Sequence, residues 1–138
     1  MIRPTKAALA FGIGMVIASP VRADYKLDLV ETGLREYYCT ITVMLTNNSD
    51  QPLTEINGYF LSYVGDMQVG RSKGNSFLNM EPGGSTEAIF ETPNAPCDDV
   101  TRYDFVIGAC RIGSGFEDRS VCLNRMDLET PFGTATGL

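Results

Sequence analysis

The chain is 138 residues long, contains no histidine and no tryptophan, and carries a formal net charge of −6. Without histidine it lacks the general base of Ser-His-Asp and Cys-His nucleophile systems and the imidazole ligands of the usual zinc and copper sites. The acidic balance disfavours nucleic acid as a partner, because a negative surface repels phosphate backbones.

Residues 1–23 have the layout of a cleaved secretory signal peptide. Two basic side chains precede an uncharged, mostly apolar run at residues 7–18, and the small Ala23 ends the segment. The run is shorter than the ~20 residues of a membrane-spanning helix, which disfavours the alternative of an uncleaved anchor. We therefore expect a periplasmic or secreted protein that begins at Asp24 and has no transmembrane segment after signal cleavage.

Beyond the leader, short stretches of alternating polarity predict β-strands, and no window keeps a convincing helical period. The expected strands lie at 25–31, 37–45, 53–64, 85–92, 102–111 and 119–127, with one or two short strands within 67–80. About seven or eight strands separated by frequent turn signals favour a single antiparallel β-sandwich or small barrel. We expect this domain to span residues 24–129 and residues 130–138 to form a flexible tail.

Four cysteines follow the leader, and an even number in an exported chain of this size favours two disulfides. Spacing alone does not select among the three possible pairings of Cys39, Cys97, Cys110 and Cys122. A glycine-rich, charged segment between Cys110 and Cys122 suits a hairpin loop, and alternation puts both on the less apolar face of their strands. We predict the pairs Cys110–Cys122 and Cys39–Cys97. No C-x2-C pair is present, which disfavours a zinc site or a redox motif.

The segment at residues 46–92 has three recognisable features in order. An Asn-Ser pair follows the second strand, "YFLSY" occupies residues 59–63, and a Pro-Gly turn precedes "AIF" at residues 88–90. With these features the segment resembles the FxLYD type of immunoglobulin-like extracytoplasmic domain, although Val64 and Gly65 stand before Asp66 where that pattern has an Asp directly after the tyrosine. The resemblance implies an immunoglobulin-like β-sandwich that often serves as an accessory or binding module. It brings no catalytic residues.

Four tyrosines are the candidate binding face: Tyr37, Tyr38, Tyr59 and Tyr63. Successive residues in a strand point to opposite faces, so Tyr37 and Tyr38 cannot both be core residues. Outward aromatic side chains on adjacent strands would form a contact face. The alternative is that they form cross-strand pairs that only stabilise the sheet.

These observations favour an exported, non-catalytic binding or accessory protein that acts through contacts with another protein or an envelope complex and needs no cofactor. One alternative is a small secreted inhibitor or loop-based enzyme that uses residues 93–99 or 112–119. Ser72 and Lys73 make a poor catalytic dyad, because adjacent side chains in a strand point to opposite faces.

A second alternative is a metal carrier that uses methionine or aspartate side chains. The carboxylate pairs Asp98-Asp99 and Glu117-Asp118 lack the spacing of a calcium loop. The scattered methionines are more simply interpreted as core residues; they are Met44, Met67, Met80 and Met126. Asn47-Asn48-Ser49 also fits the N-glycosylation pattern.

Overall fold

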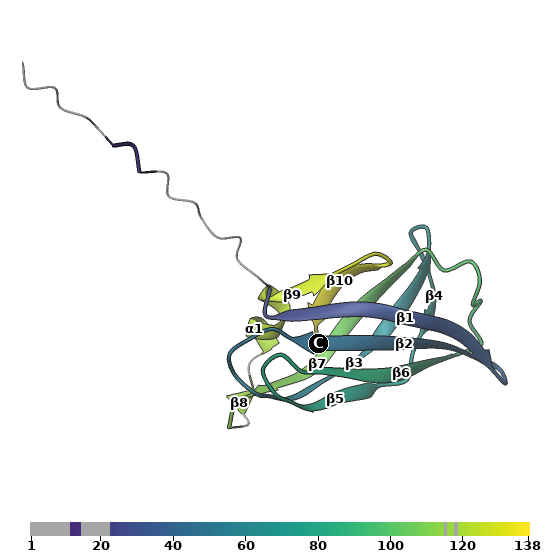
Figure 1. The fold of residues 1–138 in the computed structure, drawn as a ribbon. Coiled ribbons are helices and arrows are strands. Elements are labelled where there is room, and N and C mark those ends of the chain that lie inside the picture. The colour runs from purple at the N-terminus through teal and green to yellow at the C-terminus, as the bar shows by residue number, and fades with distance from the viewer. Residues whose placement is uncertain (1–11, 15–22, 115, 118) are drawn as a thin grey trace, which may run out of the picture.

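Two β-sheets pack face to face in the computed structural model, which describes residues 12–14, 23–114, 116–117 and 119–138 (Figure 1). The prediction of an all-β, sandwich-like fold is confirmed. The strand count is higher than predicted, since the described residues include nine strands of three or more residues and the two-residue β8 (Phe116–Glu117). The predicted signal peptide, apart from residues 12–14 and 23, lies outside the described residues.

Sheet A has the strand order β6-β2-β1-β9. Its strands are β1 (Tyr25–Arg35), β2 (Tyr38–Asn47), β6 (Ser85–Pro93) and β9 (Met126–Leu128). The middle of β2 buries Ile41, Val43 and Leu45 against sheet B, while Thr42 on the opposite face is also shielded from solvent. The inward face is the one that the sequence pattern predicts for β2.

Sheet B has the strand order β10-β7-β3-β4, with β5 paired to β3 and β8 paired to β7. Its other strands are β3 (Leu53–Val64), β4 (Met67–Arg71), β5 (Asn75–Met80), β7 (Arg102–Ile112) and β10 (Phe132–Gly137). β4 and β5 divide the same edge of β3 between them, one beside each half of the strand. The prediction of one or two short strands within residues 67–80 is therefore confirmed.

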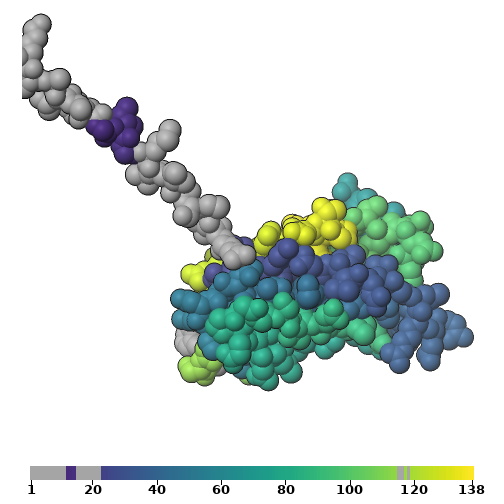
Figure 2. Space-filling view, viewed as in Figure 1, coloured from purple at the N-terminus to yellow at the C-terminus, as the bar shows by residue number. Residues whose placement is uncertain are grey.

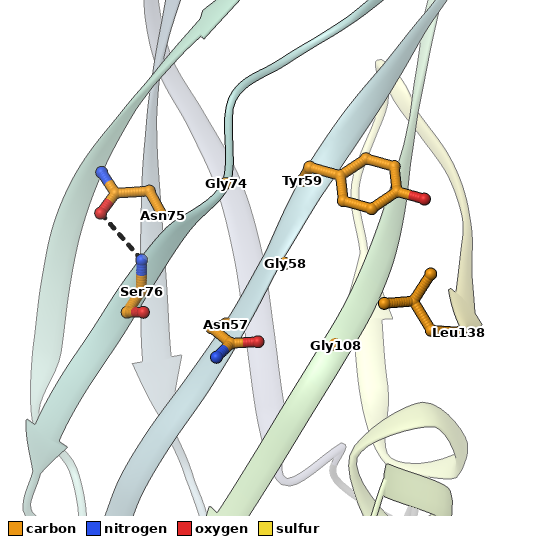
Figure 3. A pocket seen from close by; sticks show the side chains of 8 residues that line it. All are labelled: Asn57, Gly58, Tyr59, Gly74, Asn75, Ser76, Gly108 and Leu138. Carbon is orange, nitrogen blue, oxygen red and sulfur yellow. Dashed lines mark hydrogen bonds between the residues drawn. The ribbon is translucent and has the colours of Figure 1, made fainter.

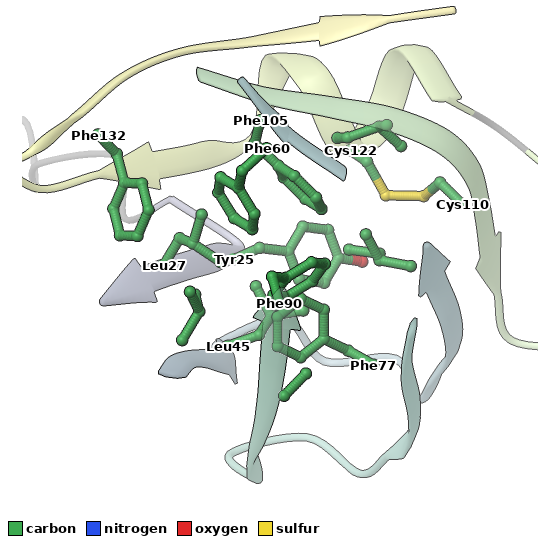
Figure 4. Packing of buried hydrophobic residues seen from close by; sticks show 14 of the residues in the cluster. Tyr25, Leu27, Leu45, Phe60, Phe77, Phe90, Phe105, Cys110, Cys122 and Phe132 are labelled. Carbon is green, nitrogen blue, oxygen red and sulfur yellow. A yellow bond between two sulfur atoms is a disulfide. The ribbon is translucent and has the colours of Figure 1, made fainter. Parts of the chain in front are cut away.

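The centre of the sandwich is an aromatic cluster contributed by five strands, with Phe77 of β5 packed on Phe90 and Phe105 (Figure 4). The ring of Phe60 stacks on Phe105 at 4.6 Å between centroids and meets Phe90 edge-on at 4.7 Å. Phe132 lies 5.4 Å from Phe60 on the other side. Offset and edge-to-face pairs of this kind contribute about 0.5–1.5 kcal/mol each beyond the burial of their area. The cluster thus joins β3, β5 and β7 of sheet B to β6 of sheet A and to β10.

Asn47 is a fully buried polar residue at the end of β2. Its side-chain amide donates hydrogen bonds to the carbonyl oxygens of Gln51 and Met80, at 2.9 and 3.2 Å. Its Oδ1 accepts hydrogen bonds from the backbone N–H and the hydroxyl of Ser49. One side chain therefore holds the β2–β3 loop against the end of β5, and its buried polar atoms are satisfied.

The disulfides join Cys39 to Cys97 and Cys110 to Cys122, as predicted. The predicted orientation of Cys110 was wrong, because this side chain is fully buried in the core. Successive residues of β3 pair with Ile107 and Ala109, which leaves Gly108 as an extra residue on β7. Such a bulge shifts the inward–outward alternation by one position. It turns Cys110 to the same face as Ile107.

The segment after the β7–β8 hairpin differs from the strand predicted at residues 119–127. Residues Arg119–Asn124 form a short helix, α1, and only the three residues of β9 follow as strand. Cys122 lies on the buried side of α1, so the disulfide fixes this helix to β7. The end of the chain also differs from the flexible tail predicted at residues 130–138. β10 pairs in parallel with β7 and buries Phe132 in the core.

Replacing Asn47 with alanine is expected to lower the free energy of unfolding by about 2–3 kcal/mol, because it leaves buried carbonyl groups without donors. Asn48→Ala is the matched control, since the Asn48 side chain is only partly buried. It should change stability by less than about 0.5 kcal/mol. Urea unfolding of both variants measures the difference. Equal stability of the two variants would contradict the role assigned to Asn47.

Candidate functional site

The outer face of sheet B displays the aromatic side chains of β3. Phe60 and Ser62 point into the core, so Tyr59, Leu61 and Tyr63 point away from it and remain partly exposed. The register of sheet B places Arg71 of β4 beside Leu61. It places Arg102 of β7 beside Tyr63. We call these five outward residues, Tyr59, Leu61, Tyr63, Arg71 and Arg102, the Tyr–Arg face.

Both tyrosines of the Tyr–Arg face are stacked with arginine. The guanidinium carbon of Arg71 lies 4.0 Å from the centroid of the Tyr59 ring, and that of Arg102 lies 4.2 Å from the Tyr63 ring. Cation–π contacts at exposed positions contribute about 0.5–1 kcal/mol each. Arg102 also forms an ion pair with Asp104 at 3.2 Å. These contacts hold the long side chains of Arg71 and Arg102 in an ordered conformation in the unbound protein.

The other two candidate tyrosines lie on the β1–β2 hairpin of sheet A. Tyr37 occupies the turn and is 85% exposed. Tyr38 is partly buried, and the ammonium of Lys73 lies 4.3 Å from its ring centroid. A hydrogen bond to Glu91 raises the pKa of Lys73 and keeps this cation charged. The structure therefore brings together Tyr59 and Tyr63 of the four and places Tyr37 and Tyr38 elsewhere.

A shallow groove of about 420 Å³ adjoins the Tyr–Arg face at Tyr59 (Figure 3). Its side-chain walls come from Asn57, Tyr59, Ser76 and Leu138, and Gly108 contributes to its floor. A Cβ atom added to Gly108 would lie 2.8 Å from Oδ1 of Asn57, so a side chain there would obstruct the groove. This groove was not predicted from the sequence, since it includes Gly108, the extra residue at the bulge of β7.

The methionine and serine candidates for the alternative metal and catalytic sites lie in the described part of the chain. No group of three or more His, Cys, Asp or Glu side chains suited to a metal ion occurs among the described residues. Met80 is buried in the core, whereas Met67 is 65% exposed at the start of β4. The Ser72 hydroxyl is buried and accepts a hydrogen bond from the backbone N–H of Phe60, which gives it a structural role.

The loop residues proposed for an inhibitor or enzyme have separate positions. Asp98 and Asp99 follow Cys97 in the exposed β6–β7 loop, which the disulfide to Cys39 joins to the β1–β2 hairpin. Glu117 lies on β8 and pairs with Arg119 at 3.7 Å, while Asp118 lies outside the described residues. The predicted glycosylation acceptor Asn47 is fully buried, so the folded protein does not expose it.

Two structural observations bear on the compartment. A pair of disulfides is typical of proteins from an oxidising, extracytoplasmic environment. In the part of the chain that the structure describes, no helix has the length and apolar character needed to cross a membrane.

No protein-family model, curated protein or solved structure matches this chain. The resemblance to FxLYD-type domains therefore stays a prediction.

The buried tyrosines make stability dependent on alkaline pH. Burial raises the pKa of Tyr103 above its usual value of 10.0, since the core disfavours the phenolate. The folded state thus binds this proton more tightly than the unfolded state. The stabilisation is complete below pH 10.0 and is lost as the pH rises through the raised pKa.

We expect Tyr103→Phe to reduce the fall in the free energy of unfolding between about pH 9 and pH 11, because it removes the titrating group. The control Tyr37→Phe removes a phenol that is 85% exposed and should leave the fall unchanged. Chemical unfolding at several pH values gives the slopes. Identical slopes for Tyr103→Phe and the unaltered protein would refute the assignment.

Proposed function

We propose that this protein is an exported, non-catalytic binding protein whose Tyr–Arg face contacts another protein. The main observation behind this proposal is that two tyrosine–arginine pairs, Tyr59–Arg71 and Tyr63–Arg102, stack on the same face of sheet B. Tyrosine and arginine are, with tryptophan, the residue types most enriched among the residues that contribute most binding energy in protein interfaces.

The rigidity of β3 supports this proposal. The side chain of Phe60 fixes the strand from inside, while the neighbouring Tyr59 faces outward. The strand is paired on both sides, by β7 along one edge and by β4 and β5 along the other. An ordered aromatic surface loses little conformational entropy on binding, which leaves more of the contact energy for affinity.

The distribution of charge favours sheet B over sheet A as the contact face. The outer side of sheet B carries Arg71, Arg102 and Arg111, in a protein of net negative charge. Its carboxylates Asp104 and Glu55 form ion pairs with Arg102 and Arg111, which leaves an excess of one positive charge among these five residues. The outer side of sheet A carries more carboxylates than cations: Asp28, Glu31, Glu87 and Glu91 against Lys26 and Arg35. A partner with acidic groups and exposed apolar side chains would complement the arginines and tyrosines of sheet B.

Two features support export and an immunoglobulin-like sandwich as parts of this proposal. The signal-peptide pattern and the disulfides agree with an extracytoplasmic location. The pairs β2–β6 and β3–β7, in opposite sheets, correspond to the central strand pairs of immunoglobulin sandwiches. The parallel pairing of β10 with β7 departs from that arrangement.

The test is capture of a partner by the tagged mature protein from its native envelope or medium. We expect one stoichiometric partner and an at least about tenfold weaker recovery with the double variant Tyr59→Ala, Tyr63→Ala, because both aromatic contacts are lost. Ile89→Ala is the matched control, since it removes a half-exposed apolar side chain from the outer side of sheet A.

Recovery must be compared between variants of equal thermal stability. Equal capture by the double variant and the unaltered protein would reject the Tyr–Arg face as the contact surface. Recovery of no partner above background would reject the binding function itself.

A further inference from the structure

The far half of β1 has an unpaired edge. On the side away from β2, only Tyr25–Leu27 are paired, by the short strand β9. No strand of the described chain covers the following residues, and every residue from Val30 to Tyr37 is exposed. The β1–β2 hairpin extends past the rest of the sandwich, at the right of the space-filling view (Figure 2). Val30, Leu34 and Tyr37 are 47%, 72% and 85% exposed there.

The backbone of this edge is suited to further pairing. The hairpin has a two-residue turn, since Arg35 pairs with Tyr38. A turn of this length closes on a hydrogen-bonded pair, so Arg35 and Gly33 direct their N–H and C=O groups toward β2. Thr32 and Leu34 therefore direct theirs to the open edge. Such an edge is a template for another strand unless it is covered or blocked.

We propose that two copies of this protein associate by antiparallel pairing of their β1 edges, centred on Gly33. In this register Gly33 lies opposite the partner's Gly33, and Thr32 lies opposite the partner's Leu34. Thr32 and Leu34 carry the backbone groups that face the edge, so these opposing residues exchange the hydrogen bonds. The contact is isologous, as in most homodimers with a twofold axis.

Charge complementarity selects this register. It places Glu31 opposite the partner's Arg35 and, by symmetry, Arg35 opposite the partner's Glu31. Neither side chain has an ion pair among the described residues of its own chain. Glu31 and Arg35 lie at non-hydrogen-bonded positions, where opposing side chains come closest, and opposite charges facing each other stabilise antiparallel pairs.

Neighbouring registers lack this match. A shift of the pairing by one residue places Thr32 opposite the partner's Gly33. The N–H and C=O groups of Gly33 point toward β2, so the hydrogen bonds between the two copies are lost. A pairing centred on Thr32 places Glu31 opposite the partner's Gly33, so the charges of Glu31 and Arg35 have no opposing charge. The bulge at Val30 limits regular pairing to the residues that follow it. The complementary segment is thus Glu31–Arg35.

The proposed association leaves the Tyr–Arg face open, because that face is on sheet B and the paired edge belongs to sheet A. The inference therefore does not rest on the proposed function. A dimer would carry two copies of the Tyr–Arg face, and two linked sites bind a partner that has paired epitopes more tightly than one site does.

Charge reversal with mixing tests this register. We expect the mature protein to dimerise in sedimentation equilibrium at micromolar to millimolar concentration. Glu31→Arg and Arg35→Glu should each weaken dimerisation by at least about tenfold, because each places like charges opposite one another at two symmetric positions. An equimolar mixture of these two variants should form a heterodimer, since every opposing pair is then of opposite charge. The double variant Glu31→Arg, Arg35→Glu should dimerise like the original protein.

Glu81→Arg is the matched control, because it makes the same charge change at an exposed position in the β5–β6 turn. It should leave dimerisation unchanged. The mixing result cannot arise from misfolding, since it requires both single variants to be folded. A monomer at all concentrations, a mixture that stays monomeric, or an equal loss with Glu81→Arg would overturn the proposal.

Discussion

The contact between Phe60 and the rings around it is the constraint on which the arrangement of the sheets depends. Phe60 stacks on Phe105 within sheet B and meets Phe90 of sheet A edge-on, so one side chain sets the position of both layers. Phe132 completes the cluster and explains why the last residues of the chain form a strand. Strand alternation then presents Tyr59 outward from the same strand, so the packing of the core determines the geometry of the Tyr–Arg face.

The two surfaces proposed for binding differ in their physical basis. The Tyr–Arg face lies on a strand paired on both sides, and its contribution comes from side chains stacked on an ordered backbone. The β1 edge offers backbone hydrogen bonds and two charges, on a hairpin that extends beyond the core. Affinity at the first surface depends on aromatic burial, whereas specificity at the second depends on register and charge. The two proposals thus place recognition of another protein and self-association on different sheets of one fold.

Local pattern predicted most of the strands, because apolar residues recur at every second position where one face of a strand meets the core. The middle of β2, with Ile41, Val43 and Leu45 inside, shows the clearest agreement. The bulge at Gly108 was not predictable from alternation, since a single extra residue reverses the phase without changing composition. The short helix that carries Cys122 has fewer than two turns and no helical period to detect. Within the candidate site, the sequence identified Tyr59 and Tyr63 but not their arginine partners, because those contacts depend on register across strands.

The two disulfides close loops of very different length, and this difference orders the steps of oxidative folding. Cys110 and Cys122 are 12 residues apart, whereas Cys39 and Cys97 are 58 apart. Chain entropy makes the longer closure costlier by about 1 kcal/mol in an unfolded chain. The shorter bridge can form within one local segment, but the longer one must wait until β2 has met the loop that precedes β7. Cys39 of β2 pairs with Thr92 of β6, five residues before Cys97, so formation of this bridge reports the pairing of β2 with β6 and the assembly of the centre of sheet A.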